Sequence, residues 1–398
     1  MKSLHALQAS QERSKFLWVF GLAVFWFAIA FWIRFVVLLV VHLYSVNTGF
    51  EGFYPLASGH DDRYYYAVAL SVAEGRKIDA LPNAYPFFLG FVFRVLGPSL
   101  LLAKAVNALF GALGVVFGVL LAERLCPWHG YPWSLRRPAH LAGIFLSFYP
   151  SAVFYSTQLL KDGAIWALGL ALLYWGIVFL QKPSARWLLV VAVASSLLWF
   201  LRPYTVIAFW IALVLPLAVL RHPRLLIGFV VVAIAVPWAM GFGPLGLGYL
   251  GPLLNPERLS QFREQVYGVG GSSLGLVLDP ARPLAFALGW MYSFVTVLLG
   301  PFPWQINSLL EAVALGEALV MWLLAIFWLP GVMRLLYRPS FAEIPLFFGL
   351  VLAGGVALFS DNIGANTRLR LLIWASLMVY AALRIGGRHA HSLSHHPR

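Results

Sequence analysis

The stretch that decides the fold class is residues 16–44, FLWVFGLAVFWFAIAFWIRFVVLLVVHLY. Arg34 is its one Asp, Glu, Lys or Arg residue, and the stretch exceeds the roughly 20 apolar residues that a helix needs to cross a bilayer. It is too long for the apolar core of a signal peptide, and no small-residue cleavage site follows it. We therefore expect a retained membrane helix.

Comparable apolar stretches recur along the chain of 398 residues. The composition is 61% hydrophobic and 11% charged, whereas a soluble domain has about 25% charged residues. We predict an all-α polytopic membrane protein with one transmembrane domain (1–386) and a cytoplasmic tail (387–398). About ten crossings are expected, at 16–44, 99–122, 141–158, 163–180, 187–201, 204–220, 225–241, 309–333, 344–359 and 371–386.

The distribution of charge predicts the orientation. One set of loops, with both termini, holds fifteen of the 28 Lys and Arg residues but three of the fifteen acids. The positive-inside rule places that set in the cytoplasm, so we expect a multi-pass protein of the cytoplasmic (inner) membrane. The cations of the +13 chain stand in small groups at helix ends, not in a stripe with interleaved aromatics, which argues against nucleic acid as a partner. The lone Cys126 cannot form an internal disulfide.

Three segments are then expected outside: a first outer loop (45–98), a second outer loop (242–283), and an apolar element (284–304) that ends in Gly-Pro-Phe-Pro-Trp. Counting this element as a full crossing would carry Arg334 and Arg338 to the outside. We therefore predict that it is re-entrant, because broken backbone at membrane depth must be buried in protein or wet.

The first outer loop carries Asp61-Asp62-Arg63-Tyr64 at the start of a predicted amphipathic helix. One interpretation is structural: an aspartate caps the helix and the tyrosines form an interfacial belt. The other is catalytic, because a carboxylate here can accept a proton from a sugar hydroxyl. A divalent metal at these residues is possible but not favoured, and no cofactor is expected.

Further ionisable residues are expected to reach the same outer face. Such residues are costly at membrane depth, so each is a functional hypothesis by default, although each alone could also be a helix-end charge at the headgroups. They are Lys161, Asp162, Arg202, Glu311, Glu317, Asp361, Arg368 and Arg370. Carboxylates near the N-terminus and arginines near the C-terminus suit a phosphate-bearing donor and a base.

With these residues in place, the sequence resembles the GT-C membrane glycosyltransferases, the group that includes protein O-mannosyltransferases and the lipid A aminoarabinose transferase. The resemblance spans almost the whole chain, roughly 16–385. It is carried by Arg34, Asp61, Asp62, Tyr64, Tyr85-Pro86, Tyr155, Lys161-Asp162, Arg202-Pro203, Pro301-Phe302-Pro303-Trp304, Glu317, Asn362-Ile363-Gly364 and Arg368-Leu369-Arg370. Many members have Asp-Glu where this chain has Asp61-Asp62, so either aspartate remains a candidate for the catalytic role.

The resemblance implies transfer of a sugar, with inversion, from a polyprenyl-phosphate donor to a hydroxyl of a lipid, glycan or protein acceptor outside the membrane. Asp61 or Asp62 would be the base, and Arg202, Arg368, Arg370 and Lys161 would bind the donor phosphate. Supporting roles fall to Arg63, Tyr64, Tyr85, Asp162 and Glu317. The lipid chain would lie beside the helix at 204–220 and the element at 284–304, and residues 241–283 would form a lid. The alternative function is a lipid-linked glycan transporter or flippase, in which the same charges would line a path.

Overall fold

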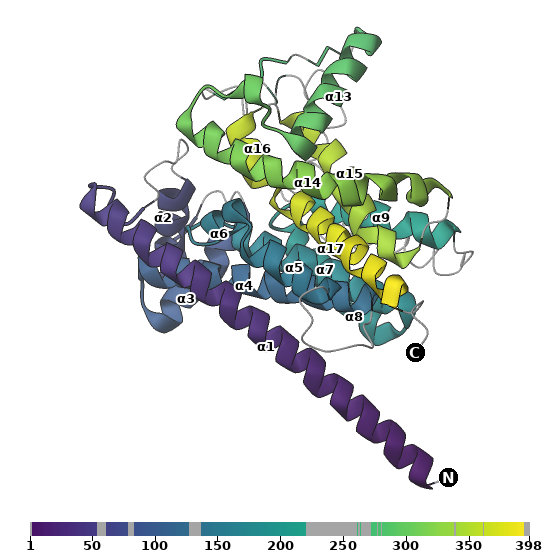
Figure 1. Cartoon of the computed structure of the whole chain (residues 1–398). Helices are drawn as coiled ribbons and strands as arrows, with labels where there is room; N and C mark the ends of the chain where they lie inside the picture. The colour runs from purple at the N-terminus through teal and green to yellow at the C-terminus, as the bar shows by residue number, and fades with distance from the viewer. Residues whose placement is uncertain are drawn as a thin grey trace.

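The protein is described here from a computed structural model, which is helical throughout its described residues (Figure 1). The described residues are 2–53, 61–78, 83–126, 137–219, 261, 263, 272–276, 278–279, 281–337, 340–360 and 362–393. The helices are α1 (Lys2–Asn47), α2 (Asp61–Ala73), α3 (Tyr85–Leu96), α4 (Leu100–Leu125), α5 (Pro138–Ser147), α6 (Pro150–Tyr155), α7 (Asp162–Gln181), α8 (Ala185–Trp199), α9 (Pro203–Val219), α13 (Pro283–Leu299), α14 (Leu309–Tyr337), α15 (Ile344–Phe359), α16 (Ile363–Leu369) and α17 (Leu371–Leu393), with short 3₁₀ turns at Pro303–Gln305 and Phe341–Glu343.

The helices are those of an all-α multi-pass membrane protein. Among the described residues, five helical segments are long and apolar enough to cross a bilayer: α1, α4, α7, α14, and α15 together with the 3₁₀ turn that precedes it. A sixth candidate is the pair α16 and α17, which is bent by 56°. Shorter apolar helices occupy several other predicted crossings, and the predicted crossing at 225–241 lies outside the described residues.

The predicted crossing at 141–158 is two short helices, α5 and α6. Pro150 stands at the first position of α6, where its missing N–H costs no helical hydrogen bond. The same ring cannot continue a helix that begins upstream, so α5 ends at Ser147. The element predicted as re-entrant contains a regular helix, α13, before the Pro-Phe-Pro-Trp turn.

The centre of the bundle is the close contact of α4 with α7. Trp166 of α7 lies against α4 and donates its indole N–H to the Gly111 carbonyl at 3.1 Å. A Cβ on Gly114 would stand 1.9 Å from the Trp166 ring, so this contact requires glycine. Glycine thereby brings two helices that run in the same direction together along much of their length, from Asn107 beside Gly163 to Phe117 beside Tyr174.

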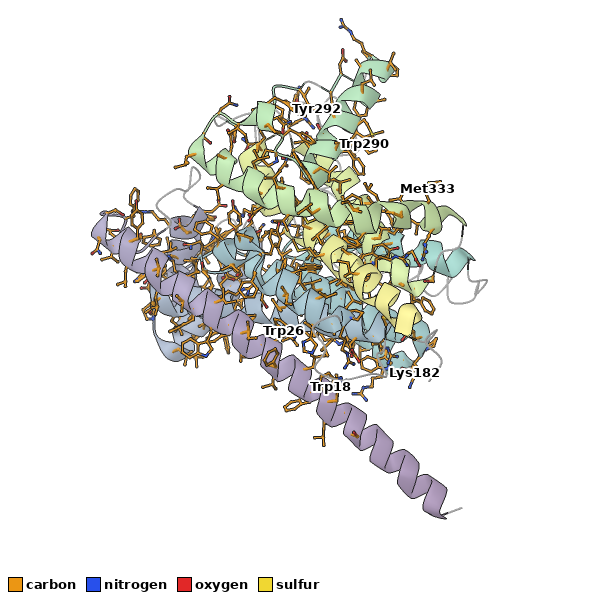
Figure 2. The ribbon with its side chains drawn as sticks, in the orientation of Figure 1. Trp18, Trp26, Lys182, Trp290, Tyr292 and Met333 are labelled. Carbon is orange, nitrogen blue, oxygen red and sulfur yellow. The ribbon has the colours of Figure 1, made fainter. Side chains whose placement is uncertain are left out.

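Helix α1 lies on the outside of the bundle, and its N-terminal turns extend beyond the other helices (Figure 1). Trp18 and Trp26 mark the part of α1 that lies along α5 (Figure 2), where the Trp26 indole donates to His140 Nδ1 at 3.1 Å. Deeper in the span, fully buried Arg34 donates to Ser156 Oγ at 3.0 Å. A charge at this depth is tolerated because protein atoms supply its hydrogen bonds.

At one end of the bundle, five elements converge: the start of α2, the start of α7, the end of α8, the start of α9 and the C-terminal half of α16. The first outer segment is attached there, because the Ala84 N–H donates to the Phe200 carbonyl at 3.3 Å. Helices α2 and α3 pack through Tyr65 and Tyr85, whose ring centroids are 5.7 Å apart. This end of the molecule therefore gathers segments that are far apart in the sequence.

Candidate active site

Asp162 is the centre of the charged group at this end of the bundle. It is the first residue of α7, and its side chain is 1% exposed. Arg202, between α8 and α9, donates to Asp162 Oδ1 at 2.8 Å, and Arg368 Nε of α16 donates to Asp162 Oδ2. A buried carboxylate is stable only when it is paired, and two arginines pair both of its oxygens.

Arg368 joins this buried acid to a second, accessible one. Its Nη1 donates to Asp61 Oδ2 at 2.8 Å, while its Nε donates to Asp162. The Asp61 side chain is 47% exposed. One guanidinium thus orients a carboxylate that an incoming hydroxyl group can still reach.

The two neighbouring aspartates have different environments. Asp62 is 2% exposed, and it accepts the Arg63 backbone N–H at 2.8 Å. It lies within electrostatic range of Lys104, a buried lysine of α4. Asp62 therefore anchors the start of α2 to the bundle, whereas Asp61 faces outward.

Lys104 is a buried charge that the sequence analysis did not single out. Its ammonium donates to the Gly52 carbonyl at 2.6 Å and to Gln158 Oε1 at 3.2 Å. A single lysine within an apolar helix is the signal that could have found it. Its contacts fix the backbone that leads from α1 toward α2.

Lys161 completes what we call the outer cluster: Asp61, Lys161, Asp162, Arg202 and Arg368. Within the described residues, its ammonium forms no hydrogen bond or salt bridge. Burial, and then the neighbouring positive charge of Arg202, lower the Lys161 pKa to about 8. With three cations and two carboxylates, the outer cluster has a net charge of +1, which favours a bound anion.

Arg370 and Glu317 form a separate, buried pair. Arg370 is 1% exposed, lies 3.7 Å from Glu317 Oε2, and donates to the Gly300 carbonyl. Its guanidinium carbon is 3.7 Å from the centroid of the Trp374 ring. Glu317 also accepts from Ser151 Oγ at 2.6 Å. From the sequence we expected Arg370 to act with Arg368, but the structure places the two arginines in different clusters.

One hydrogen bond connects α6 to the helix that carries Arg368. The Tyr155 hydroxyl and Thr367 Oγ1 are 2.8 Å apart. Thr367 also donates to the Gly364 carbonyl at 2.7 Å. Tyr155 therefore steadies α16 beside Arg368.

The remaining predicted site residues lie around α2 and α3. Arg63 is 3.9 Å from Glu51 and stacks on the Phe53 ring at 5.0 Å, while Tyr64 is 45% exposed. Tyr85 is buried against Tyr65, a residue that the sequence analysis did not name as part of the site. Burial raises the Tyr65 pKa to about 12, and Arg368 and Asp61 lie within electrostatic range of it.

Some predicted elements fall outside the described residues, namely Asp361 and most of the predicted lid at 241–283. In the part of the chain that the structure describes, no three His, Cys, Asp or Glu side chains are arranged to hold a metal ion.

Comparison with known proteins adds no family. No protein-family model matches this chain, and no curated protein matches it. A functional assignment must therefore be argued from the outer cluster itself.

Proposed function

We propose that this chain is an inverting glycosyltransferase of the GT-C type, which moves a sugar from a polyprenyl-phosphate donor to a hydroxyl group outside the membrane. One observation carries the proposal: an accessible carboxylate, Asp61, is held by Arg368 within a cluster whose net charge is +1. A base next to an anion site is what transfer from a sugar phosphate requires. The resemblance over 16–385 supports the same chemistry.

In this proposal Asp61 is the general base. It removes the proton from the acceptor hydroxyl as that oxygen attacks the anomeric carbon on the face opposite the phosphate. The bond between the anomeric carbon and the phosphate oxygen breaks, and its electron pair stays with the phosphate. A phosphate is a weak base and departs without a general acid, so one carboxylate is enough.

Lys161, Arg202 and Arg368 would bind the phosphate. The donor is a phosphodiester with one negative charge, which matches the +1 of the outer cluster. Cleavage leaves a phosphate monoester with more negative charge, so fixed cations stabilise the transition state and product more than the donor. Asp162 would position Arg202 and Arg368 without contacting the substrate.

The arrangement favours Asp61 over Asp62 as the base, because Asp62 is buried at the foot of α2. It also favours a positioning role for Arg370, which we predicted from the sequence as a phosphate ligand. Arg370 contacts Glu317, Gly300 and Trp374 and so holds the junction of α16 and α17 in place.

Ten crossings, with both termini in the cytoplasm, remain part of the proposal. The structure supports the proposed orientation, because the outer cluster and a group of basic residues lie at opposite ends of the bundle. The basic group lies near the end of α4, the end of α7, the start of α8 and the end of α14. It includes Arg124, Lys182, Arg186 and Arg334.

A lipid-linked glycan transporter or flippase is the second candidate. The 56° bend between α16 and α17 supports it, because broken helices are typical of transporters. The difference is chemical: a transporter moves the intact lipid, whereas a transferase releases free polyprenyl phosphate.

The deciding experiment uses the purified protein in nanodiscs. Membranes are added to supply the acceptor, and a panel of undecaprenyl-phosphate sugars is offered as donor. Release of undecaprenyl phosphate is the readout, since every sugar donor yields it. Asp61→Asn should lower the rate by a factor of about 100 to 10,000, the effect of losing a general base. Asp62→Asn, of similar size, should keep the rate within about tenfold of wild type if the protein folds. No release from any donor, together with movement of intact lipid across sealed vesicles, would favour the transporter.

A further inference from the structure

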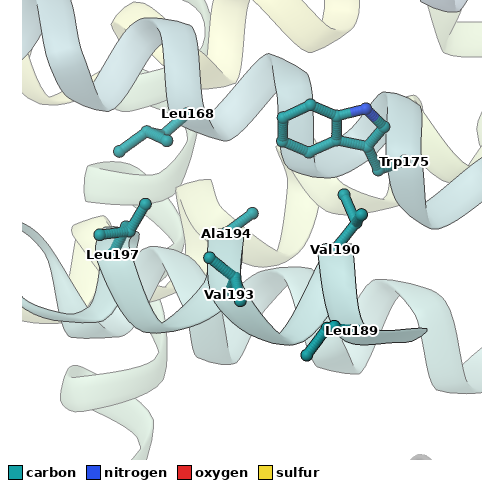
Figure 3. Close-up of a pocket in the computed structure, with 7 residues that line it drawn as sticks. All are labelled: Leu168, Trp175, Leu189, Val190, Val193, Ala194 and Leu197. Atoms are coloured by element: carbon teal, nitrogen blue, oxygen red, sulfur yellow. The ribbon is translucent and has the colours of Figure 1, made fainter. Parts of the chain in front are cut away.

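A groove lies between α7 and α8 (Figure 3). Its volume is about 310 Å³. All the residues that line it are apolar: Leu168, Trp175, Leu189, Val190, Val193, Ala194 and Leu197. Such a surface offers almost no hydrogen-bond partner to a polar ligand, so it suits a hydrocarbon chain.

The groove opens toward the outside of the bundle. Leu189, Val193 and Leu197 are 65%, 52% and 52% exposed. Because α7 is one of the helices able to cross a bilayer, this surface faces lipid tails and not water. A chain already dissolved in the membrane can enter it sideways.

The end of the groove at Leu168 is the end nearer the outer cluster. Leu168 follows Asp162 by six residues on α7, which is about 9 Å along the helix axis. Trp175 lies about 20 Å from Asp162 by the same measure. On the other wall, α8 ends at Trp199, just before Arg202. The two helices that form the groove therefore also carry Asp162 and lead to the phosphate-binding arginine.

The opposite end carries Lys182 and Arg186, which are exposed. Lys182 lies at the margin of the bundle (Figure 2). Exposed cations are well hydrated and hold a headgroup weakly, whereas Arg202 and Arg368 are fixed by a buried carboxylate. Charge complementarity therefore favours an anionic headgroup at the Asp162 end.

We infer that this groove holds the isoprenoid chain of the polyprenyl-phosphate donor, with the phosphate at Lys161, Arg202 and Arg368. The identity of the headgroup rests on the proposed function. The inference revises the expectation that the chain lies beside the helix at 204–220 and the element at 284–304.

The first test is photocrosslinking, which needs no transfer. Benzoylphenylalanine is placed at Val193 in the groove or at Ile211 of α9, which is 47% exposed and outside the groove. The protein is reconstituted in nanodiscs of phosphatidylethanolamine and phosphatidylglycerol with radiolabelled undecaprenyl phosphate. Position 193 should be labelled at least about tenfold more than position 211, and unlabelled undecaprenyl phosphate should compete.

Two outcomes would overturn the inference. Equal labelling at the two positions would mean that the groove holds ordinary bilayer lipid. If undecaprenol, which lacks the phosphate, competed as well as undecaprenyl phosphate, the cations of the outer cluster would not contribute to binding of the chain. Specific labelling of position 193 in a protein that shows no transfer would leave the groove assignment standing while the proposed transferase activity fails.

The second test fills the groove. Val193→Trp should weaken binding of undecaprenyl phosphate by at least about tenfold while leaving the affinity for neryl phosphate, with two isoprene units, unchanged. Ile211→Trp, the matched control, should change neither affinity. Loss of both affinities in Val193→Trp with an unaltered melting temperature would place the effect at the phosphate and contradict the groove assignment.

Discussion

Two groups of charged residues lie at opposite ends of this bundle, and they differ in whether their positive and negative charges balance. Near the end of α4, Arg137 Nε donates to Glu123 Oε2 at 2.9 Å, and its NH2 group donates to Glu123 Oε1. The Arg137 guanidinium also stacks on Trp18 at 4.6 Å. Within this pair one acid is matched by one base, so the pair itself has no net charge and is suited to holding helices together.

The outer cluster is built differently. Asp162 binds two arginines, one of them extends to the accessible Asp61, and Lys161 adds a cation without a hydrogen bond among the described residues. The excess of +1 and the exposed carboxylate are features that helix packing alone does not need. Both groups contain buried charges, so burial does not distinguish them. The outer cluster differs from the structural pair in its net charge and in having a carboxylate that solvent can reach.

The largest expected effect comes from removing the buried acid at each end. Asp162→Ala and Glu123→Ala should each destabilise the protein by about 3 to 5 kcal/mol, because each leaves buried arginine without its partner. Asp162→Ala should in addition lower transfer by the folded protein by about 100-fold, because Arg202 and Arg368 lose their positions. Glu123→Ala should retain the wild-type specific activity.

The loss of stability is measured as the melting temperature in detergent. The loss of activity is measured as the transfer rate at a temperature where both variants are folded. Equal specific activities in the two variants would remove the functional distinction between the ends.

The next effect concerns the arginines. Arg202→Met should weaken donor binding by about 1.5 to 3 kcal/mol, the scale of a hydrogen bond to a charged group. Arg202→Lys should recover part of the loss, because an ammonium cannot reproduce the planar fork. Arg137→Met is the control at the other end and should leave donor affinity unchanged. Titration of each variant with undecaprenyl methyl phosphate measures the affinity, and a similar loss in both methionine variants would contradict the assignment.

The lowered pKa of Lys161 predicts how donor binding depends on pH. Its pKa is lowered to about 8 in the free protein, so the ammonium is charged below pH 8 and neutral above it. Affinity for a ligand of fixed negative charge should be constant below about pH 8 and fall as the pH rises through that value. Undecaprenyl methyl phosphate has such a charge, since its diester does not titrate in this range. Lys161→Met should bind more weakly, without the decline above pH 8; a decline that persists in this variant would assign the titration to another group.

The smallest expected effect is at the contact that steadies α16. Tyr155→Phe should cost about 0.5 to 1.5 kcal/mol of stability, since it removes one hydrogen bond while Thr367 keeps its bond to Gly364. Transfer should fall by less than about tenfold, because Asp61 and Asp162 still hold Arg368. Thr367→Val and the double variant complete a thermodynamic cycle, and strictly additive losses would show that the two hydroxyl groups are not coupled.

The sequence by itself determined the membrane class, because burial in lipid requires long apolar segments and hydropathy is a local property of the chain. It also located Asp61, Lys161, Asp162, Arg202 and Arg368, since charges beside apolar helices are conspicuous. The tertiary structure decided the partners. Arg368 reaches Asp162 across 206 residues and Asp61 across 307, separations over which local patterns carry no information.

Tertiary structure also decided what adjacent charges do. Arg368 and Arg370 are two residues apart, and positions so spaced on a helix point to different sides; the break after Leu369 then directs Arg370 to Glu317. The same holds for Asp61 and Asp62, of which one is exposed and one is buried beside Lys104. The sequence could name these residues as a group, but only packing assigned each carboxylate to solvent or to the protein interior, because burial depends on which helix covers it.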